Sequence, residues 1–276
     1  MLNRRQLEEY KNDGFTIYKN FLNKLIIKNI INEVNSVITS NKISQESIME
    51  MEPDENKAVR RLYEPCSNYP ICKEVSESKI VLDCVEQLIG KNIIFHYSKL
   101  NMKPPRVGSV VEWHQDLTYY PLTNNDSLTF LIYLDNASSE NGCLKIIKKS
   151  HISGIKNHDK NDIFQGRVME KVDEHNVEYI EASAGTAIFM HCMSLHSSAQ
   201  NISQKSRRTL IMSYRAVDAY PIYSKMTEKT ESSARLVRGK HSNVARFNFE
   251  SFPIPRFKEE IKSLYELQKD SRENRI

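Results

Sequence analysis

Long apolar runs are missing from this sequence of 276 residues. No stretch reaches the roughly 18 apolar residues that a helix needs to cross a bilayer. The opening MLNRRQLEEYKNDGF also lacks the apolar segment that a signal peptide requires. A transmembrane helix and export are therefore not expected, and we predict a cytoplasmic protein that has no membrane partner.

Cysteine is scarce as well. The five cysteines are odd in number and form no Cys-x-x-Cys pair, so we expect reduced thiols rather than a disulfide framework. Cys192 adjoins His191, but no base for its thiol can be identified. Nucleophilic catalysis by this cysteine is therefore not expected.

Neither sign of charge dominates. The 39 lysines and arginines are mixed along the chain with 35 acidic residues, and the net charge is only +4. The sequence has no basic stripe and no aromatic–basic motif, so nucleic-acid binding is not expected. The small positive excess weakly favours an anionic small molecule as the partner.

Repeats, low-complexity segments and linkers are also absent, which predicts a single domain over residues 1–276. Apolar residues at helical spacing predict a helix from Asn23 onward and another over Ser78–Ile89, so residues 1–92 are expected to be mostly helical. Residues 218–276 are expected to form a C-terminal loop and a helix over Phe257–Gln268.

Between these parts, residues 93–217 contain short β-type segments separated by polar turns. A tight turn is expected at Asn141–Gly142, and a polar loop over residues 41–57. The pattern predicts a mainly β protein with flanking α-helices, a barrel or a sandwich. The expected strands are Ile93–Asn101, Val110–Asp116, Leu128–Asp135, Cys143–Ile147, Thr186–His191 and Arg207–Ala216.

The segment WHQD places His114 and Asp116 one residue apart on an expected strand. Side chains alternate across a strand, so these two are expected to project from the same face. An imidazole and a carboxylate that converge form two corners of a metal site, and a third ligand must come from elsewhere. The candidates for it are histidines 96, 151, 158, 175, 191, 196 and 241.

His196 is distinguished by its surroundings. A polar, turn-rich stretch follows it, and a new strand opens at Arg207 and Arg208. We expect a long hairpin that sets an arginine beside His196 on a neighbouring strand. Two histidines and one carboxylate form the facial triad of non-haem Fe(II) oxygenases, which leaves coordination positions for a chelating 2-oxo acid and for dioxygen. An arginine suits the far carboxylate of such an acid.

Together these segments resemble the phytanoyl-CoA dioxygenase (PhyH-like) family of Fe(II)- and 2-oxoglutarate-dependent oxygenases. His-x-Asp alone is a weak signal, but the matching pieces span residues 10–208 in the family's order. They are YKNDGFTIYKNFL, NMKPP, WHQD, ENGCLKII with KKSH, and HSSAQNISQKSRR.

The resemblance implies a double-stranded β-helix, the cupin-like jelly roll, with helices against one sheet. It implies that His114, Asp116 and His196 ligate the iron. The family's 2-oxoglutarate arginine lies eleven residues after the distal histidine, which selects Arg207 over Arg208. Strand alternation agrees, because Arg207 shares a face with polar positions whereas Arg208 shares one with apolar positions.

The resemblance also implies the reaction. Fe(II), 2-oxoglutarate and dioxygen would hydroxylate an unactivated C–H bond and release succinate and carbon dioxide. Asp116 favours hydroxylation, because a related halogenase would need a small residue there; desaturation and cyclisation stay open. We expect a small polar or anionic metabolite as substrate, bound by variable loops over residues 41–60, 119–127, 152–176 and 218–245.

Several alternatives remain open. Tyr119 and Tyr120 are candidates for lining the substrate cavity, or for packing under a loop. Arg60 and Arg61 are more consistent with solvated or structural roles than with carboxylate binding. A non-catalytic jelly-roll binding or regulatory protein, and a zinc hydrolase with no role for Arg207, compete with the dioxygenase. The sequence does not decide between a monomer and a homodimer.

Overall fold

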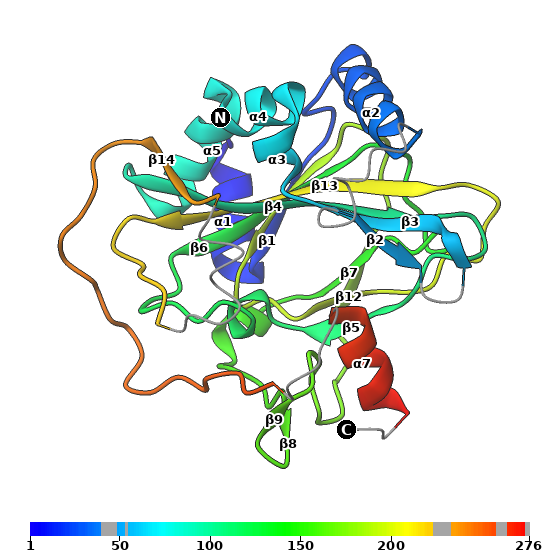
Figure 1. Ribbon diagram of the computed structural model, residues 1–276. Helices are drawn as coiled ribbons and strands as arrows, with labels where there is room; N and C mark the ends of the chain where they lie inside the picture. The colour runs from blue at the N-terminus through cyan, green and yellow to red at the C-terminus, as the bar shows by residue number, and fades with distance from the viewer. Residues whose placement is uncertain (40–48, 53–54, 223–232, 258–263, 274–276) are drawn as a thin grey trace.

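Two antiparallel β-sheets face each other, with helices covering the outer face of the larger one (Figure 1). This arrangement is seen in a computed structural model that describes residues 1–39, 49–52, 55–222, 233–257 and 264–273. It is the jelly roll that the sequence predicts, a mainly β protein with flanking helices. No helix within these ranges is long and apolar enough to cross a membrane, and the five cysteines are free and buried, as expected.

The larger sheet supplies one wall of the cavity described below. In the order of their pairing, its strands are β1 (Phe15–Tyr18), β11 (Ala187–His191), β6 (Ser127–Tyr133), β13 (Arg207–Ala216), β4 (Ile93–Lys103), β3 (Glu55–Tyr63) and β2 (Met49–Glu52), and β14 (Arg235–Arg238) also pairs with β4.

The smaller sheet supplies the opposite wall. Its strands pair in the order β10 (Val177–Ile180), β7 (Leu144–Ile147), β12 (His196–Ser198) and β5 (Val111–His114). A separate short ribbon pairs β8 (Asp159–Lys160) with β9 (Ile163–Phe164).

The N-terminal helices pack on the outer face of the larger sheet (Figure 1). The first begins at a capping box between Asn3 and Gln6 and ends at Gly14, whose φ of 86° suits a left-handed C-cap. Their apolar sides share one core with the outward residues of β4, β6 and β13. The helices are α1 (Arg4–Asp13), α2 (Lys24–Thr39), α3 (Pro65–Asn68), α4 (Pro70–Glu77) and α5 (Lys79–Ile89), and α7 (Leu264–Arg272) packs near β5 in the smaller sheet.

Successive side chains of strand β13 point alternately to the two faces of the larger sheet. Its residues Leu210, Met212 and Tyr214 join the core beneath the helices, whereas Arg207 and Thr209 line a cavity between the sheets. Arg207 and Thr209 on the inner face are buried polar side chains, whereas the outer face is apolar apart from the half-buried Arg208 and the hydroxyl group of Tyr214. The alternation predicted for this strand is therefore confirmed.

Three predicted elements need correction. Residues 49–52 and 55–57 belong to a β-hairpin rather than a polar loop, because β2 pairs with β3 and β3 pairs with β4; residues 40–48 and 53–54 lie outside the described part. The strand expected over Val110–Asp116 ends at His114. The last helix is described over Leu264–Arg272, shifted from Phe257–Gln268, and residues 258–263 are outside the described ranges.

The hairpin expected between His196 and Arg207 is also wrong. Strand β12, which carries His196, belongs to the smaller sheet, and β13 belongs to the larger one. The polar segment between them crosses from one sheet to the other. Arg207 therefore approaches from the facing sheet, not from a neighbouring strand.

Gly142 lies in the predicted turn and cannot be replaced without strain. Its φ is +76°, and a Cβ atom there would lie 2.3 Å from the carbonyl oxygen of Ala199. We expect Gly142→Ala to lower the free energy of unfolding by more than the roughly 1–2 kcal/mol that a left-handed backbone costs alanine. Denaturant unfolding measures this change.

Gly154→Ala is the matched control. Gly154 has the same φ of +76°, but nothing lies within 4 Å of the added Cβ position. The Gly154→Ala substitution should lower the free energy of unfolding only by the cost of a left-handed backbone at alanine. Equal destabilisation by the two substitutions would contradict the close approach at Gly142.

Candidate metal centre

Two histidines face each other across paired strands. His114 on β5 is the direct cross-strand partner of His196 on β12, and their ring centroids are 4.0 Å apart. The Nδ1 atom of His114 lies 2.7 Å from the carbonyl oxygen of Glu112, and that of His196 lies 3.0 Å from the carbonyl oxygen of Ser194. These contacts fix each ring and leave both Nε2 atoms available for a metal.

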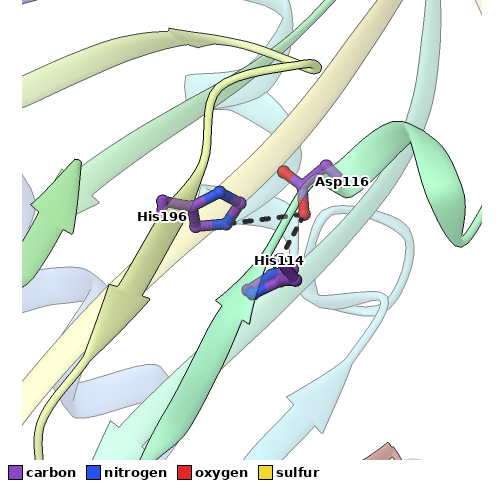
Figure 2. Close-up of side chains that lie close together, drawn as sticks. All are labelled: His114, Asp116 and His196. Carbon is purple, nitrogen blue, oxygen red and sulfur yellow. Dashed lines mark ion pairs between the residues drawn. The ribbon is translucent and has the colours of Figure 1, made fainter. Parts of the chain in front are cut away.

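Asp116 completes the cluster from beyond the end of β5. A 3₁₀ turn over Asp116–Thr118 begins there, and it carries the carboxylate toward both rings (Figure 2). Its Oδ1 lies 3.6 Å from Nε2 of His114 and 3.7 Å from Nε2 of His196. Its Oδ2 accepts a 2.6 Å hydrogen bond from Thr129. The convergence of His114 and Asp116 is confirmed, although the turn produces it rather than strand alternation alone.

The electrostatics of the cluster suit a divalent cation. All three side chains are buried. Burial lowers the pKa of His196 to about 3, so its imidazole is neutral. Burial alone would raise the pKa of Asp116, but the two imidazoles and Lys99 outweigh it and hold that pKa well below its usual range. The site therefore offers the imidazole nitrogens of His114 and His196 and one carboxylate oxygen.

His114, Asp116 and His196 lie close enough together to bind one metal ion. The three ligand atoms all lie within 4.8 Å of one another, and no other group of three potential ligands is found among the described residues. Two imidazoles and one carboxylate, open on the cavity side, form the donor set of a non-haem iron(II) facial triad. Among the seven candidate histidines, the structure thus brings only His196 to the pair. His191, as expected, lies elsewhere and accepts a hydrogen bond from the backbone of Met193.

Arg207 reaches the same cavity from the opposite sheet. It donates to Thr209 at 2.9 Å and to the carbonyl oxygen of Gly142 at 2.5 Å. Its Nε is buried and has no acceptor within the described part of the chain. A buried donor without a partner is costly, and a ligand carboxylate would satisfy it.

Arg208 has a different environment. Its guanidinium makes two hydrogen bonds, of 2.8 and 2.7 Å, to the carboxylate of Asp135. It is not among the residues that line the cavity. Of the two neighbouring arginines, only Arg207 lines the metal cluster's cavity, and it keeps a buried donor without a partner among the described residues.

The cavity wall also contains four cations that sequence reasoning did not assign to it. Arg60 and Arg61 on β3, and Lys99 and Lys103 on β4, line it together with the triad. The arginines are buried and paired with Glu50, so they are not solvated side chains. The sequence could have indicated Lys99, because it lies two and four residues from Asn101 and Lys103 on the same strand and therefore projects from the same face as these lining residues.

Tyr119 and Tyr120 lie outside the described cavity lining. The ring of Tyr119 packs edge-on against that of His114 at 5.3 Å, and its hydroxyl donates to the carbonyl oxygen of Gly166. Tyr120 is buried against His96 and Tyr97. Their position favours packing, the second of the two roles considered from the sequence, and Tyr119 supports a ring of the triad.

The loops expected to bind substrate contribute little to this cavity. Apart from Arg60, none of the described residues in those four ranges lines it. In the last range, Arg235 pairs with Glu77, and Arg238 pairs with Asp83 and Glu86. The lining comes instead from the inner faces of the two sheets, where side chains of paired strands converge.

Comparison with known proteins agrees with this geometry. The family model "Phytanoyl-CoA dioxygenase (PhyH)" matches residues 10–209. A protein of Stutzerimonas stutzeri named as a probable alpha-ketoglutarate-dependent hypophosphite dioxygenase is 30% identical, over 79% of this chain and 80% of its own length. A methylphosphonate hydroxylase of Gimesia maris is 29% identical, over 77% and 80% respectively.

Solved structures resemble the fold. The crystal structure of EctD from S. alaskensis with bound Fe covers 87% of this chain and 88% of its own, with a TM-score of 0.71 and 18% identity. At that identity the likeness concerns the fold. It places the two facing sheets of this chain among jelly rolls of known structure.

Proposed function

This chain belongs to the phytanoyl-CoA dioxygenase family and is a 2-oxoglutarate-dependent non-haem iron dioxygenase, and on that premise we propose that it hydroxylates a small anionic metabolite. The observation that carries the proposal is one cavity between the sheets. It holds the metal triad together with the cations Arg207, Arg61 and Lys99.

His114, Asp116 and His196 hold the iron in this proposal. Their backbone and Thr129 contacts fix the orientation of the three ligand atoms before the metal arrives. Iron(II) and 2-oxoglutarate supply an oxidising chemistry with dioxygen in which a substrate C–H becomes C–OH while 2-oxoglutarate becomes succinate and carbon dioxide. The chain's own part is to orient both organic molecules in a cavity largely shielded from water.

Arg207 anchors the distal carboxylate of 2-oxoglutarate in this proposal. Its Nε is a buried donor without a partner among the described residues, in a side chain that lines the cavity, and a carboxylate is the planar, doubly accepting group that suits a guanidinium edge. Thr209 holds the guanidinium in place from two residues along the same face of β13. The facing-sheet position lets the co-substrate extend across the cavity from the arginine to the metal.

The primary substrate is proposed to be a small phosphorus oxyanion that bears an oxidisable hydrogen. Two relatives, at 30% and 29% identity, are named for hypophosphite and methylphosphonate. Both molecules are compact anions, as a cation-lined cavity requires. Methylphosphonate also carries the unactivated C–H bond on which hydroxylation acts.

A metabolite screen coupled to succinate release tests this function. With iron(II), 2-oxoglutarate and air, small phosphonates and other compact anions are expected to raise succinate formation by at least about tenfold over the substrate-free rate. A response to apolar lipids alone would contradict the substrate class. Binding of 2-oxoglutarate without consumption for any candidate would favour the non-catalytic alternative.

A further inference from the structure

Lys99 and Arg61 form a pair of cations on neighbouring strands. Arg61 on β3 is directly opposite Asn101 on β4, and Lys99 lies two residues from Asn101. Residues in this diagonal relation are about 7–8 Å apart and within reach of long side chains. Both side chains line the cavity that contains the triad.

Both cations have donors left over. Arg61 donates through Nε to Asn101 at 2.9 Å, and through Nη1 to Tyr63 and Glu50 at 3.3 and 3.5 Å. No residue of the described ranges accepts a hydrogen bond from its Nη2 or from Nζ of Lys99. The Lys99 ammonium lies 5.4 Å from the ring centroid of Tyr97, a contact that leaves its N–H groups available.

The arginine is held rigidly for such a role. Glu50 of β2 pairs with Arg60 and Arg61 and accepts a hydrogen bond from the hydroxyl group of Tyr63. All these groups are mostly buried. A guanidinium fixed on two edges presents its third edge to a ligand at little further entropic cost.

The charges of the cavity do not balance without another anion. Iron(II), Asp116, Arg207 and doubly charged 2-oxoglutarate cancel one another. Lys103 donates to the carbonyl oxygens of Ser109 and Ala199, and Glu52 is an acidic neighbour that acts on it electrostatically. Arg61 and Lys99 then share Glu50, which also pairs with Arg60, as the remaining carboxylate among the described lining and its partners, and the cavity keeps an excess of positive charge.

We infer that Lys99 Nζ and Arg61 Nη2 form the subsite that binds the primary substrate, and that this substrate carries a compact oxyanion whose best match is a phosphonate dianion. The inference rests on the proposed function and deepens it. A zwitterionic metabolite fits less well, because its ammonium group would enter a field that is already positive.

The protonation of Lys99 is consistent with such a subsite. Burial lowers the pKa of Lys99 to about 8, although Asp116 opposes the shift. The ammonium is thus charged at neutral pH but poorly solvated. A bound oxyanion would compensate for the lost solvation.

Anaerobic calorimetry with methylphosphonate as the probe tests the inference. The chain is loaded with iron(II) and 2-oxoglutarate, and the absence of dioxygen prevents turnover. We expect Lys99→Met and Arg61→Gln each to weaken methylphosphonate binding by at least about 30-fold, because each removes a charged partner in a buried site. The affinity for 2-oxoglutarate should change by less than about threefold, since Arg207 is untouched.

Matched variants and probes complete the design. Lys91→Met removes an exposed lysine near the start of the same strand, and it should leave binding unchanged. Lys99→Arg keeps the charge and should restore most of the affinity even if Lys99→Met is less stable. Acetate and glycine serve as the carboxylate and zwitterion probes, and both should bind more weakly than methylphosphonate.

The outcomes separate this inference from the proposed function. If wild-type protein binds 2-oxoglutarate, but methylphosphonate binding is the same in Lys99→Met and Arg61→Gln, the subsite is overturned and the dioxygenase remains. If glycine binds more tightly than methylphosphonate, the proposal that the substrate is an anion rather than a zwitterion is overturned. Failure of the iron-loaded wild type to bind 2-oxoglutarate would instead overturn the proposed function.

Discussion

Replacing Asp116 by alanine is expected to reduce succinate formation by at least about a thousandfold. The carboxylate is the only charged ligand of the triad, and a bound metal contributes several kcal/mol to reactions of this kind. The same substitution should weaken iron(II) binding, which equilibrium dialysis measures. Thr129 would lose the acceptor of its 2.6 Å hydrogen bond, so a loss of stability is also expected and must be measured separately.

Asp173→Ala is the control for this prediction. Asp173 is exposed and lies outside the cavity lining, so its loss should leave iron binding and turnover unchanged. A folded Asp116→Ala protein that binds iron(II) as tightly as the wild type would show that the metal lies elsewhere. His196→Ala should behave like Asp116→Ala, because it removes a second ligand of the same ion.

Arg207→Gln is expected to raise the KM for 2-oxoglutarate by roughly 30-fold to more than 1,000-fold. Truncating one partner of a buried, hydrogen-bonded charge pair costs about 2–5 kcal/mol, and in the proposal Arg207 is that partner. The KM for the primary substrate should change much less, since Lys99 and Arg61 remain. Steady-state kinetics with each substrate varied in turn separates the two effects.

Arg208→Gln provides the comparison at the adjacent position. It removes the bonds to Asp135, so thermal stability should fall while the KM for 2-oxoglutarate stays within about twofold of the wild type. A large rise in that KM for Arg208→Gln, with none for Arg207→Gln, would reverse the assignment of the anchor. That result would also contradict the prediction from strand alternation that Arg207, and not Arg208, acts in the cavity.

The metal cluster was largely accessible from the sequence. His114 and Asp116 are neighbours in the chain, and His196 lies 80 residues beyond Asp116 in a motif of its own. The resemblance to the dioxygenase family implied the jelly roll, and strand alternation predicted the inward face of β13. These features depend on short-range patterns, which a single sequence displays directly.

The geometry between distant strands was less accessible. The sequence predicted a hairpin from His196 to Arg207, whereas the chain crosses between sheets. A polar connection of this length has no local feature that distinguishes a hairpin within one sheet from a crossing between two sheets. The path is decided by strand pairing, because β12 pairs with β5 and β7 in the smaller sheet.

The cationic wall was missed for a related reason. Arg60 and Arg61 follow a polar segment that resembles a loop, and only the pairing of β3 with β2 and β4 buries them. Glu50 becomes their counterion through the same pairing. Neither Lys99 nor Arg61 has a motif around it, and their roles emerge only from the strands that meet in the sheet.

Anaerobic visible spectroscopy tests the central claim most directly, namely that one triad holds iron(II) where 2-oxoglutarate chelates it. Adding iron(II) and then 2-oxoglutarate to the wild-type protein should produce a weak charge-transfer band. The band should be absent from His114→Ala and from Asp116→Ala at matched protein concentration. No band in the folded wild-type protein, or an unchanged band in both variants, would contradict the assignment of this site.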